Sequence, residues 1–390
     1  MQIIDILLLV VLLSALVVGL QRGFFASLGS LLGVIAGGAA ALWVVPLVND
    51  AVPWDQWRGI LVLAVAVLLL VFGAAVGGAL GMLVRRGADR IRLRAVERLA
   101  GGAVSVVVAA LAISLVGQSV SATGMPVVSQ ALASSQVLRT IEDLTPRPVQ
   151  TTLAQLRGAV MDGGLPRVGE LLVPGSVDAA PEVQLDDPAL ATAAQSVARV
   201  SGVAYACGTS ATGSGFVLAP DRVVTNAHVV AGVETPVVEV PGETAKEGRI
   251  VYFDPIDDLA VIAVDGLAAP ALAVVPTLVA GDAAVVQGYP FGGPFTMGGA
   301  EVLSVGGAPV PDIYEDQVAS REVYALAATV QPGNSGGPLL TAEGDVAGVV
   351  FARGEGDADR GYAMTTTELG PVLAQAEDLT QAVSTGRCLG

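Results

Sequence analysis

Three short motifs hold the residues of this chain that are best suited to chemistry. TNAHVV contains His228, DDLAVIAV begins with Asp257 and Asp258, and QPGNSGGPLL contains Ser335. A serine hydroxyl becomes a nucleophile when a histidine takes its proton and a carboxylate fixes the tautomer of that histidine. One group of each kind predicts acyl transfer through a covalent intermediate. Asp257 and Asp258 compete for the role of the carboxylate, and Asp254 is a third option.

The glycines around Ser335 suit a donor site for a developing negative charge. A tight turn through GNSGG can aim the backbone N–H groups of Gly333 and Ser335 at one point, where the carbonyl oxygen of a substrate would become an oxyanion. His228 is the only histidine among the 390 residues, and it lies inside one of the motifs. Its position favours a catalytic role over a structural one.

The motifs lie in a region that reads as short strands. From about residue 200 onward, runs such as GSGFVL, GRIVYF and DVAGVVFAR alternate in polarity and are separated by Gly, Pro and Asp. This pattern predicts an all-β barrel or sandwich. The length of the region suits two small barrels, with residues 267–278 crossing from one to the other.

The first 120 residues differ sharply in composition. Four apolar stretches lie at about 3–20, 24–46, 59–84 and 99–120, and each approaches the ~20 residues that a helix needs to span a bilayer. The first stretch lacks a preceding basic segment and a convincing cleavage site, so we interpret it as a retained span rather than a signal peptide. The sequence therefore predicts an all-α transmembrane domain of four helices.

Charge distribution predicts how this domain is oriented. Residues 85–98 carry six of the arginines, which places that loop in the cytoplasm. An even number of spans then puts both chain ends outside, together with everything after residue 120. The net charge is −16, made up of +3 in residues 1–120 and −19 beyond them. This acidic charge argues against nucleic-acid binding through a basic surface.

The motifs resemble those of a known enzyme class. Over about residues 200–370, the ordered series GSGFVL, TNAHVV, DLAV, GYPFG and GNSGGPLL is similar to chymotrypsin-fold serine proteases of the HtrA-like bacterial branch. The N-terminal part looks like the colicin V production (CvpA-type) membrane family. The fusion of the two resembles the membrane-anchored periplasmic serine proteases of actinobacteria associated with acid resistance (MarP type).

The resemblance implies a fold, an activity and a role for each site residue. The fold would be a chymotrypsin-like double β-barrel. His228 would be the general base, Asp258 its orienting carboxylate and Ser335 the nucleophile, and the N–H groups of Gly333 and Ser335 would form the oxyanion hole. The expected domains are a four-span CvpA-like domain at 1–120, an extracytoplasmic helical linker at 121–178 and a trypsin-like serine protease domain at 179–390.

The resemblance also implies partners and a physiological role. We expect a serine endopeptidase that hydrolyses a protein or peptide substrate in the cell envelope, in envelope stress or acid resistance, and that contacts the lipid bilayer. We expect no nucleic acid, no metal and no organic cofactor, since one histidine and two cysteines are too few for an all-Cys/His zinc site. The alternative is a membrane scaffold or sensor whose protease-like domain only binds peptides.

The two cysteines, Cys207 and Cys388, both lie in the part assigned outside the cytoplasm. Disulfides persist in such compartments. We therefore predict a structural disulfide between them, ahead of two separate thiols or a redox switch. It would tie the start of the first barrel to the C-terminal segment.

Overall fold

An apolar helical region precedes a β domain, as the composition predicts. The chain divides into two units, Met1–Ser114 and Leu115–Gly390. The structure is a computed structural model that describes residues 3–51, 55–88, 94–121, 135–146, 148–150, 152–153, 166–168, 171–172, 185–204, 209–355 and 357–389.

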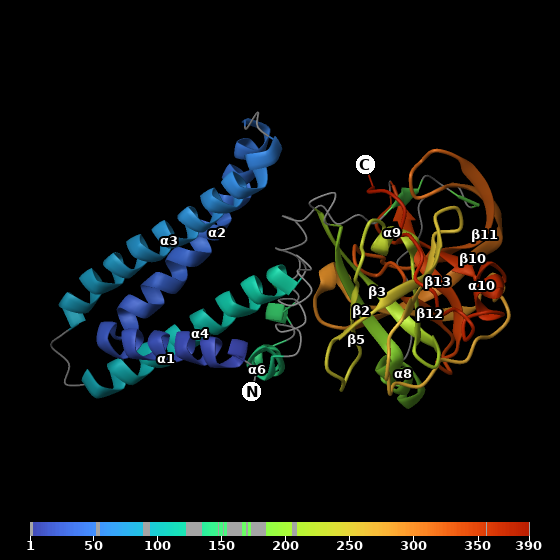
Figure 1. The fold of residues 1–390 in the computed structure, drawn as a ribbon. Helices are drawn as coiled ribbons and strands as arrows, with labels where there is room; N and C mark the ends of the chain where they lie inside the picture. Colours follow the sequence, from blue (N-terminus) through green and yellow to red (C-terminus); the bar gives the residue numbers. More distant parts are fainter. Residues whose placement is uncertain are drawn as a thin grey trace. The chain divides into compact units, whose positions relative to one another are not determined.

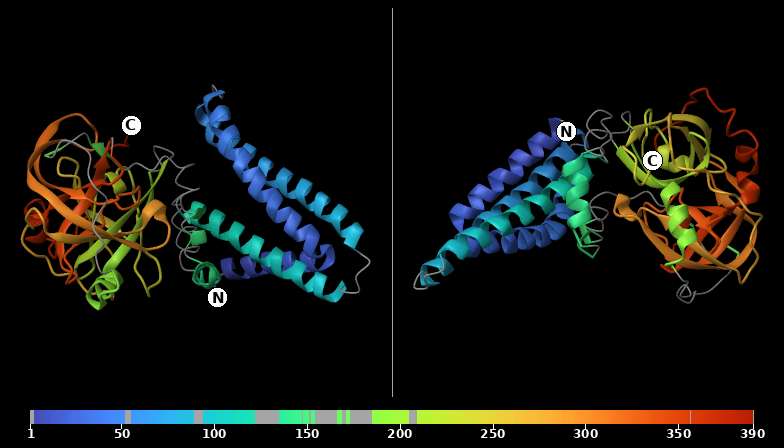
Figure 2. Two further views of the ribbon diagram at one scale, coloured as in Figure 1. Left: turned by 180° about the vertical axis from the view of Figure 1, so that it is seen from behind. Right: turned by 90° about the horizontal axis from the view of Figure 1, so that it is seen from below.

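Long apolar helices make up the first unit. They are α1 (Ile3–Arg22), α2 (Phe24–Ala51), α3 (Asp55–Ala88) and α4 (Arg94–Ser121), and Figures 1 and 2 show α2 beside α3 and α1 beside α4. In the described residues, two apolar segments, Ile4–Arg22 and Ala95–Ser114, are long enough to cross a membrane. Phe24–Ala40 and Leu68–Val84 are shorter. The number of four spans therefore stays a prediction.

Glycines bring α2 and α3 into close contact. Gly29, Gly33 and Gly37 are four residues apart in the sequence, so they lie on one face of α2. A Cβ added at Gly33 would overlap the carbonyl oxygen of Gly73, and one added at Gly29 would overlap that of Gly77. Small residues at this spacing serve packing within the chain, because they let two helix backbones approach each other.

Replacing Gly33 with alanine is expected to destabilise the helical region by about 1–3 kcal/mol, because the new methyl group meets backbone that cannot move away. Thermal unfolding of the full chain in detergent measures the effect. Gly38→Ala is the matched control, since a Cβ added at Gly38 would lie 3.7 Å from Leu70 Cδ2, in a side chain that can adjust. Equal melting temperatures for the two variants would contradict this account of the packing.

Short helices lead into the β domain. Helix α6 (Gln136–Leu144) is capped at its N-terminus by Ser135, whose side chain accepts a hydrogen bond from the N–H of Leu138. Helix α8 (Pro188–Ala193) is capped at its N-terminus by Asp187, whose carboxylate accepts a hydrogen bond from the N–H of Ala189. A 3-10 turn at Ala194–Ser196 continues α8.

In the described residues, the β domain consists of two sheets of seven strands each. The first has the order β6-β5-β2-β3-β4-β8-β7 and the second the order β1-β13-β12-β9-β10-β11-β14. The strands of the first sheet are β2 (Val197–Ala204), β3 (Thr209–Ala219), β4 (Arg222–Thr225), β5 (Val237–Glu239), β6 (Lys246–Glu247), β7 (Arg249–Asp254) and β8 (Leu259–Ala263). The strands of the second are β1 (Arg167–Val168), β9 (Ala283–Gly288), β10 (Thr296–Pro311), β11 (Val318–Ala327), β12 (Pro338–Leu340), β13 (Val346–Gly354) and β14 (Arg360–Thr365), followed by α10 (Thr366–Leu373).

The two sheets differ in how far they close. An additional pairing of β13 with β14 joins strands β9 to β14 into a ring. Among the described strands of the first sheet, β6 and β7 stand at its two ends. A double β-barrel is therefore not confirmed, and the coarser prediction of a two-part β domain holds.

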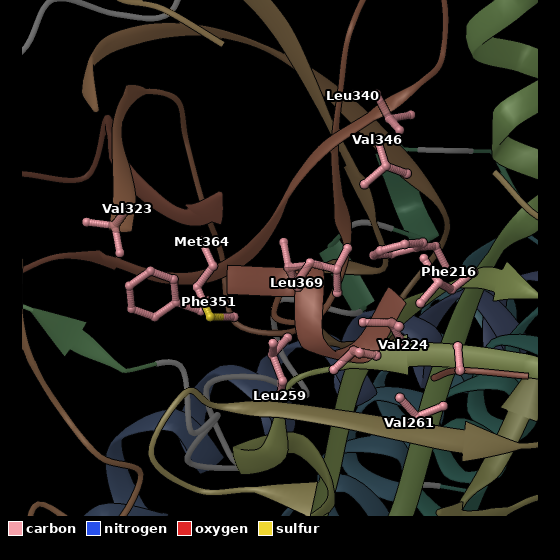
Figure 3. Close-up of a cluster of buried hydrophobic side chains, with 14 of the residues drawn as sticks. Phe216, Val224, Leu259, Val261, Val323, Leu340, Val346, Phe351, Met364 and Leu369 are labelled. Atoms are coloured by element: carbon pink, nitrogen blue, oxygen red, sulfur yellow. The ribbon is translucent and has the colours of Figure 1, made fainter. Parts of the chain in front are cut away.

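A shared hydrophobic core joins the sheets. Phe216, Val224, Leu259 and Val261 of the first sheet belong to one buried cluster with Leu340 and Val346 of the second (Figure 3). Strand β8 is buried along its whole length. Leu259, Val261 and Ala263 belong to the shared core, whereas Ala260 and Ile262 belong to the core of the first sheet itself. This two-sided burial fixes the register of β8, and with it the turn that precedes the strand.

The segment at 267–278 connects the sheets as predicted. The N–H of Leu272 donates to the carbonyl of Val217 in β3, at 2.9 Å. The N–H of Val275 donates to the carbonyl of Val346 in β13, also at 2.9 Å. The segment is thus bonded to both sheets and helps to hold them together.

Candidate active site

Strand pairing brings His228 and Asp258 together. Thr225, the last residue of β4, lies opposite Ala260 in β8. The chain leaving β4 enters the short helix α9 (Ala227–Val230) after Asn226. His228 therefore follows the paired position on one strand while Asp258 precedes it on the other, and in an antiparallel pair these two positions lie at the same end.

The contact between the two side chains is direct and buried. Nδ1 of His228 lies 2.7 Å from Oδ2 of Asp258, and the backbone N–H of His228 donates to Oδ1 at 2.9 Å. The two residues are 7% and 2% exposed. A carboxylate that binds both the backbone and the ring fixes the orientation of the imidazole. It favours the tautomer with a proton on Nδ1, which leaves Nε2 free to accept a proton.

The three neighbouring aspartates have different environments. Asp254 forms the turn, because its Oδ1 accepts hydrogen bonds from the N–H groups of Ile256 and Asp257. Burial, and then the charge of Asp254, raises the pKa of Asp257. Asp258 has a φ of +55°, a left-handed conformation that aspartate tolerates better than most residues. Of the three, Asp258 contacts His228 directly.

Ser335 lies in the loop between β11 and β12, which are two strands of the second sheet. Its carbonyl accepts a hydrogen bond from the N–H of Ser214 in β3, at 2.8 Å. A Cβ added at Gly336 would lie 2.9 Å from the backbone N of Asn226. The loop therefore packs against the strands that position His228. In the part of the chain that the structure describes, neither the Ser335 hydroxyl nor Nε2 of His228 has a hydrogen-bond partner.

Backbone N–H groups near Ser335 are also unused. Within the described ranges, the N–H groups of Gly333 and Ser335 donate to no protein acceptor. Gly333 has a φ of +97°, which glycine adopts readily. The carbonyl of Pro332 accepts a hydrogen bond from the N–H of Phe291. Since the C=O and N–H of a trans peptide point in opposite directions, this bond turns the Gly333 N–H away from Phe291.

A buried arginine adds positive charge to the site. Arg321 in β11 is 2% exposed, and its Nη2 donates to the carbonyl of Pro311. Its guanidinium carbon lies 5.4 Å from the centre of the Phe351 ring. Burial lowers the pKa of Arg321, and the charge of Asp258 is the strongest influence that opposes the shift. A buried cation on β11 is therefore favoured by the negative charge of Asp258.

Hydrogen bonds hold the C-terminal segment next to the helix that carries His228. The N–H of Gly232, just after α9, donates to the carbonyl of Thr385, and the N–H of Val383 donates to that of Ile250. Cys388 is disulfide-bonded. Cys207 lies outside the described residues, so the predicted pair stays a prediction.

Where the structure describes the chain, no three His, Cys, Asp or Glu side chains are grouped as a metal ion would require.

Two residues that sequence reasoning missed support the site. The hydroxyl of Ser214 donates to the carbonyl of Gly333 at 2.7 Å and accepts the N–H of Tyr289 at 2.9 Å. The side-chain amide of Asn226 donates to the carbonyl of Asp258 at 2.8 Å. Ser214 lies in the motif GSGFVL and Asn226 in the motif TNAHVV. Polar residues between buried neighbours in those motifs were the available signal.

Comparison with known proteins decides the family. The model of the trypsin-like peptidase domain matches residues 213–349, and that of the colicin V production protein matches residues 4–146. Serine protease Rv3671c of Mycobacterium tuberculosis is 34% identical over 396 residues, covering 100% of this chain and 99% of the relative. The chain belongs to the Rv3671c family of serine proteases.

Other similarities agree with this assignment. The crystal structure of the Rv3671c protease in its active form is 36% identical, with a TM-score of 0.53, covering 57% of this chain and 100% of that one. A probable periplasmic serine endoprotease, DegP-like, of Hahella chejuensis is 32% identical over 181 residues, covering 45% of this chain and 37% of the relative. The protein is thus a membrane-anchored serine endopeptidase. A helical region of the colicin V production type precedes its chymotrypsin-like β domain.

Proposed function

We propose that Ser335, His228 and Asp258 are the catalytic triad of this endopeptidase, and that the N–H groups of Gly333 and Ser335 form its oxyanion hole. The observation that carries the proposal is the double hydrogen bond from His228 to the carboxylate of Asp258, through Nδ1 and the backbone N–H. It leaves Nε2 as the proton acceptor. The unpartnered hydroxyl of Ser335 supports its role as the nucleophile.

The proposed reaction follows from these positions. As Oγ of Ser335 attacks the carbonyl carbon of a peptide bond, Nε2 of His228 takes the hydroxyl proton. The N–H groups of Gly333 and Ser335 stabilise the negative oxygen of the tetrahedral intermediate. His228 then protonates the leaving amine, which departs and leaves an acyl group on Ser335. Water, deprotonated by the same imidazole, releases the acid.

The proposal includes an arrangement in the membrane. We place a four-span CvpA-like domain at residues 1–120, a linker at 121–178 and a double-barrel protease domain at 179–390, with the protease domain outside the cytoplasm. The six arginines at 85–98 support this orientation. The two apolar segments long enough to span a bilayer support the anchor. A pair of Cys207 with Cys388 and a part in envelope stress or acid resistance belong to the same proposal.

Cleavage of a general protein substrate tests the proposal against the alternative of a peptide-binding scaffold. The full chain in detergent is incubated with fluorescently labelled casein, and its fragments are identified by mass spectrometry. We expect cleavage at internal peptide bonds. Binding of casein without the appearance of fragments would favour the scaffold.

Activity is expected to fall in acid, because Nε2 of His228 must be unprotonated to accept the serine proton. Loss of a single proton-accepting group lowers the rate about tenfold for each pH unit below its titration. The measurement is kcat/KM for a soluble quenched fluorescent peptide from about pH 4 to pH 8. A profile that stays flat over this range would contradict the role of His228.

A further inference from the structure

A turn at residues 289–293 packs directly against Gly333, whose N–H group is assigned above to the proposed oxyanion hole. A Cβ added at Gly333 would overlap the carbonyl oxygen of Tyr289 and lie 2.6 Å from the backbone N of Phe291. The N–H of Phe291 also holds the carbonyl of Pro332. The turn therefore sets both where Gly333 lies and which way its N–H points.

The turn itself has an unfavourable backbone conformation. Phe291 has a φ of +55° and a ψ of +23°, a left-handed conformation that a residue with a bulky side chain rarely adopts. Such a conformation persists only where surrounding contacts hold it. Within the turn, the N–H of Gly292 donates to the carbonyl of Tyr289, and the N–H of Gly293 to that of Pro290. The carbonyl of Gly292 accepts a hydrogen bond from a residue outside the turn.

That contact comes from Arg199 in β2. Nη1 of Arg199 donates to the carbonyl of Gly292 at 3.2 Å, and its guanidinium carbon lies 5.9 Å from the centre of the Tyr289 ring. Nε and Nη2 bind the two carboxylate oxygens of Glu239 in β5, at 3.0 and 2.6 Å. A planar guanidinium held at two points by a carboxylate has a fixed direction for its remaining donors.

The environment of this pair keeps it charged. The side chains of Arg199 and Glu239 are 18% and 16% exposed. Burial alone would lower the pKa of Arg199, but the charge and hydrogen bond of Glu239 raise it above its ordinary value. Glu142 of helix α6 adds a weaker effect of the same sign. The guanidinium is a permanent donor at this position.

We infer that Arg199, clamped by Glu239, is a positioning residue for the oxyanion hole: it holds the 289–293 turn, which in turn aims the N–H of Gly333 at the reacting carbonyl. Arg199 does not touch the reacting atoms. Its contribution is to transition-state stabilisation, because the hole acts where negative charge develops. This inference rests on the proposed function of Ser335 and Gly333.

The test compares Arg199→Met, Arg199→Lys and the double variant Arg199→Met/Glu239→Met with the wild-type full chain in detergent. The double variant replaces the whole ion pair with apolar side chains, so it leaves no unpaired buried carboxylate and keeps the fold. The matched control is Arg249→Met. Arg249 makes a similar paired contact with Asp265, at 3.0 and 3.2 Å, but both side chains are mostly exposed.

Two kinds of measurement separate positioning from a structural role. The first is kcat and KM for a quenched fluorescent peptide built on a casein site that the wild-type enzyme cleaves. The second is inhibition by the matching peptide aldehyde and peptide alcohol. The aldehyde forms a bond to Ser335 and places its oxygen in the hole, whereas the alcohol binds without forming one. Loss of folded protein changes neither inhibition constant.

We expect kcat to fall about 10- to 100-fold in Arg199→Met and in the double variant, with KM nearly unchanged, because removal of a whole oxyanion donor costs about 10²–10³. Aldehyde affinity should fall by the same factor while alcohol affinity stays constant. Arg199→Lys should recover part of the activity, since an ammonium can still donate to Gly292. Arg249→Met should match the wild type.

Other outcomes overturn the inference. An unchanged ratio of aldehyde to alcohol affinity in both methionine variants would show that the hole does not depend on Arg199. A rise in KM and in the alcohol constant with unchanged kcat would assign Arg199 to substrate binding instead. Failure of the proposed function is distinguishable, because Ser335→Ala would then still cleave the peptide and would bind the aldehyde as tightly as the wild type does.

Discussion

Replacing Ser335 with alanine is expected to lower kcat on the order of 10⁶-fold, because the reaction loses its nucleophile. The fold should remain intact, since the hydroxyl of Ser335 makes no hydrogen bond to the described protein. The backbone contact from Ser214 to the carbonyl of Ser335 is kept in the variant. Steady-state hydrolysis of the quenched fluorescent peptide measures the loss, and thermal unfolding measures the fold.

Ser320→Ala is the control for this variant. Ser320 is an exposed serine on β11, on the strand that leads toward the Ser335 loop. It should keep wild-type activity. If Ser335→Ala retained more than about one-thousandth of the wild-type kcat, a different nucleophile would have to carry the reaction.

Replacing Asp258 with asparagine is expected to lower kcat about 10⁴-fold. The asparagine amide has one oxygen and one NH₂ group, whereas the carboxylate accepts hydrogen bonds from both Nδ1 and the backbone N–H of His228. With the NH₂ group facing Nδ1, the imidazole must carry its proton on Nε2. It then cannot accept the proton of Ser335. The kcat of the variant across neutral and alkaline pH measures the effect.

Asp257→Asn is the matched control, one residue away and chemically identical. Burial raises the pKa of Asp257, and the charges that act on this carboxyl are those of Asp254, Glu368 and Arg321 rather than that of His228. We expect its kcat to stay within about threefold of the wild type, an effect of less than 1 kcal/mol. Equal losses for the two variants would remove the distinction that the hydrogen bonds make between them.

The nucleophile and base could be predicted because their supporting residues are local. Gly333 and Gly336 have the positive φ angles that the turn around Ser335 needs, and both lie within two residues of the serine in the sequence. The choice between Asp257 and Asp258 depended on a resemblance, because adjacent residues of one type look alike to any sequence pattern. The left-handed backbone at Asp258 and the pairing of β4 with β8 distinguish them in space.

Arg199 shows why the rest of the site could not be predicted. It stands in an ordinary strand, VARV, and its contacts reach Glu239 and Gly292, which are 40 and 93 residues away. No local pattern records such a contact, because it depends on the packing of a strand against a distant turn.

Labelling with a fluorophosphonate probe tests the central claim most directly. The probe reacts with a serine hydroxyl only when a base activates it and an oxyanion hole receives the phosphoryl oxygen. The full chain in detergent is labelled near neutral pH, digested and mapped by mass spectrometry. We predict a single adduct on Ser335 that is absent from Ser335→Ala and strongly reduced in Asp258→Asn. An unlabelled wild-type chain, or an adduct on another serine that persists in Ser335→Ala, would contradict the account.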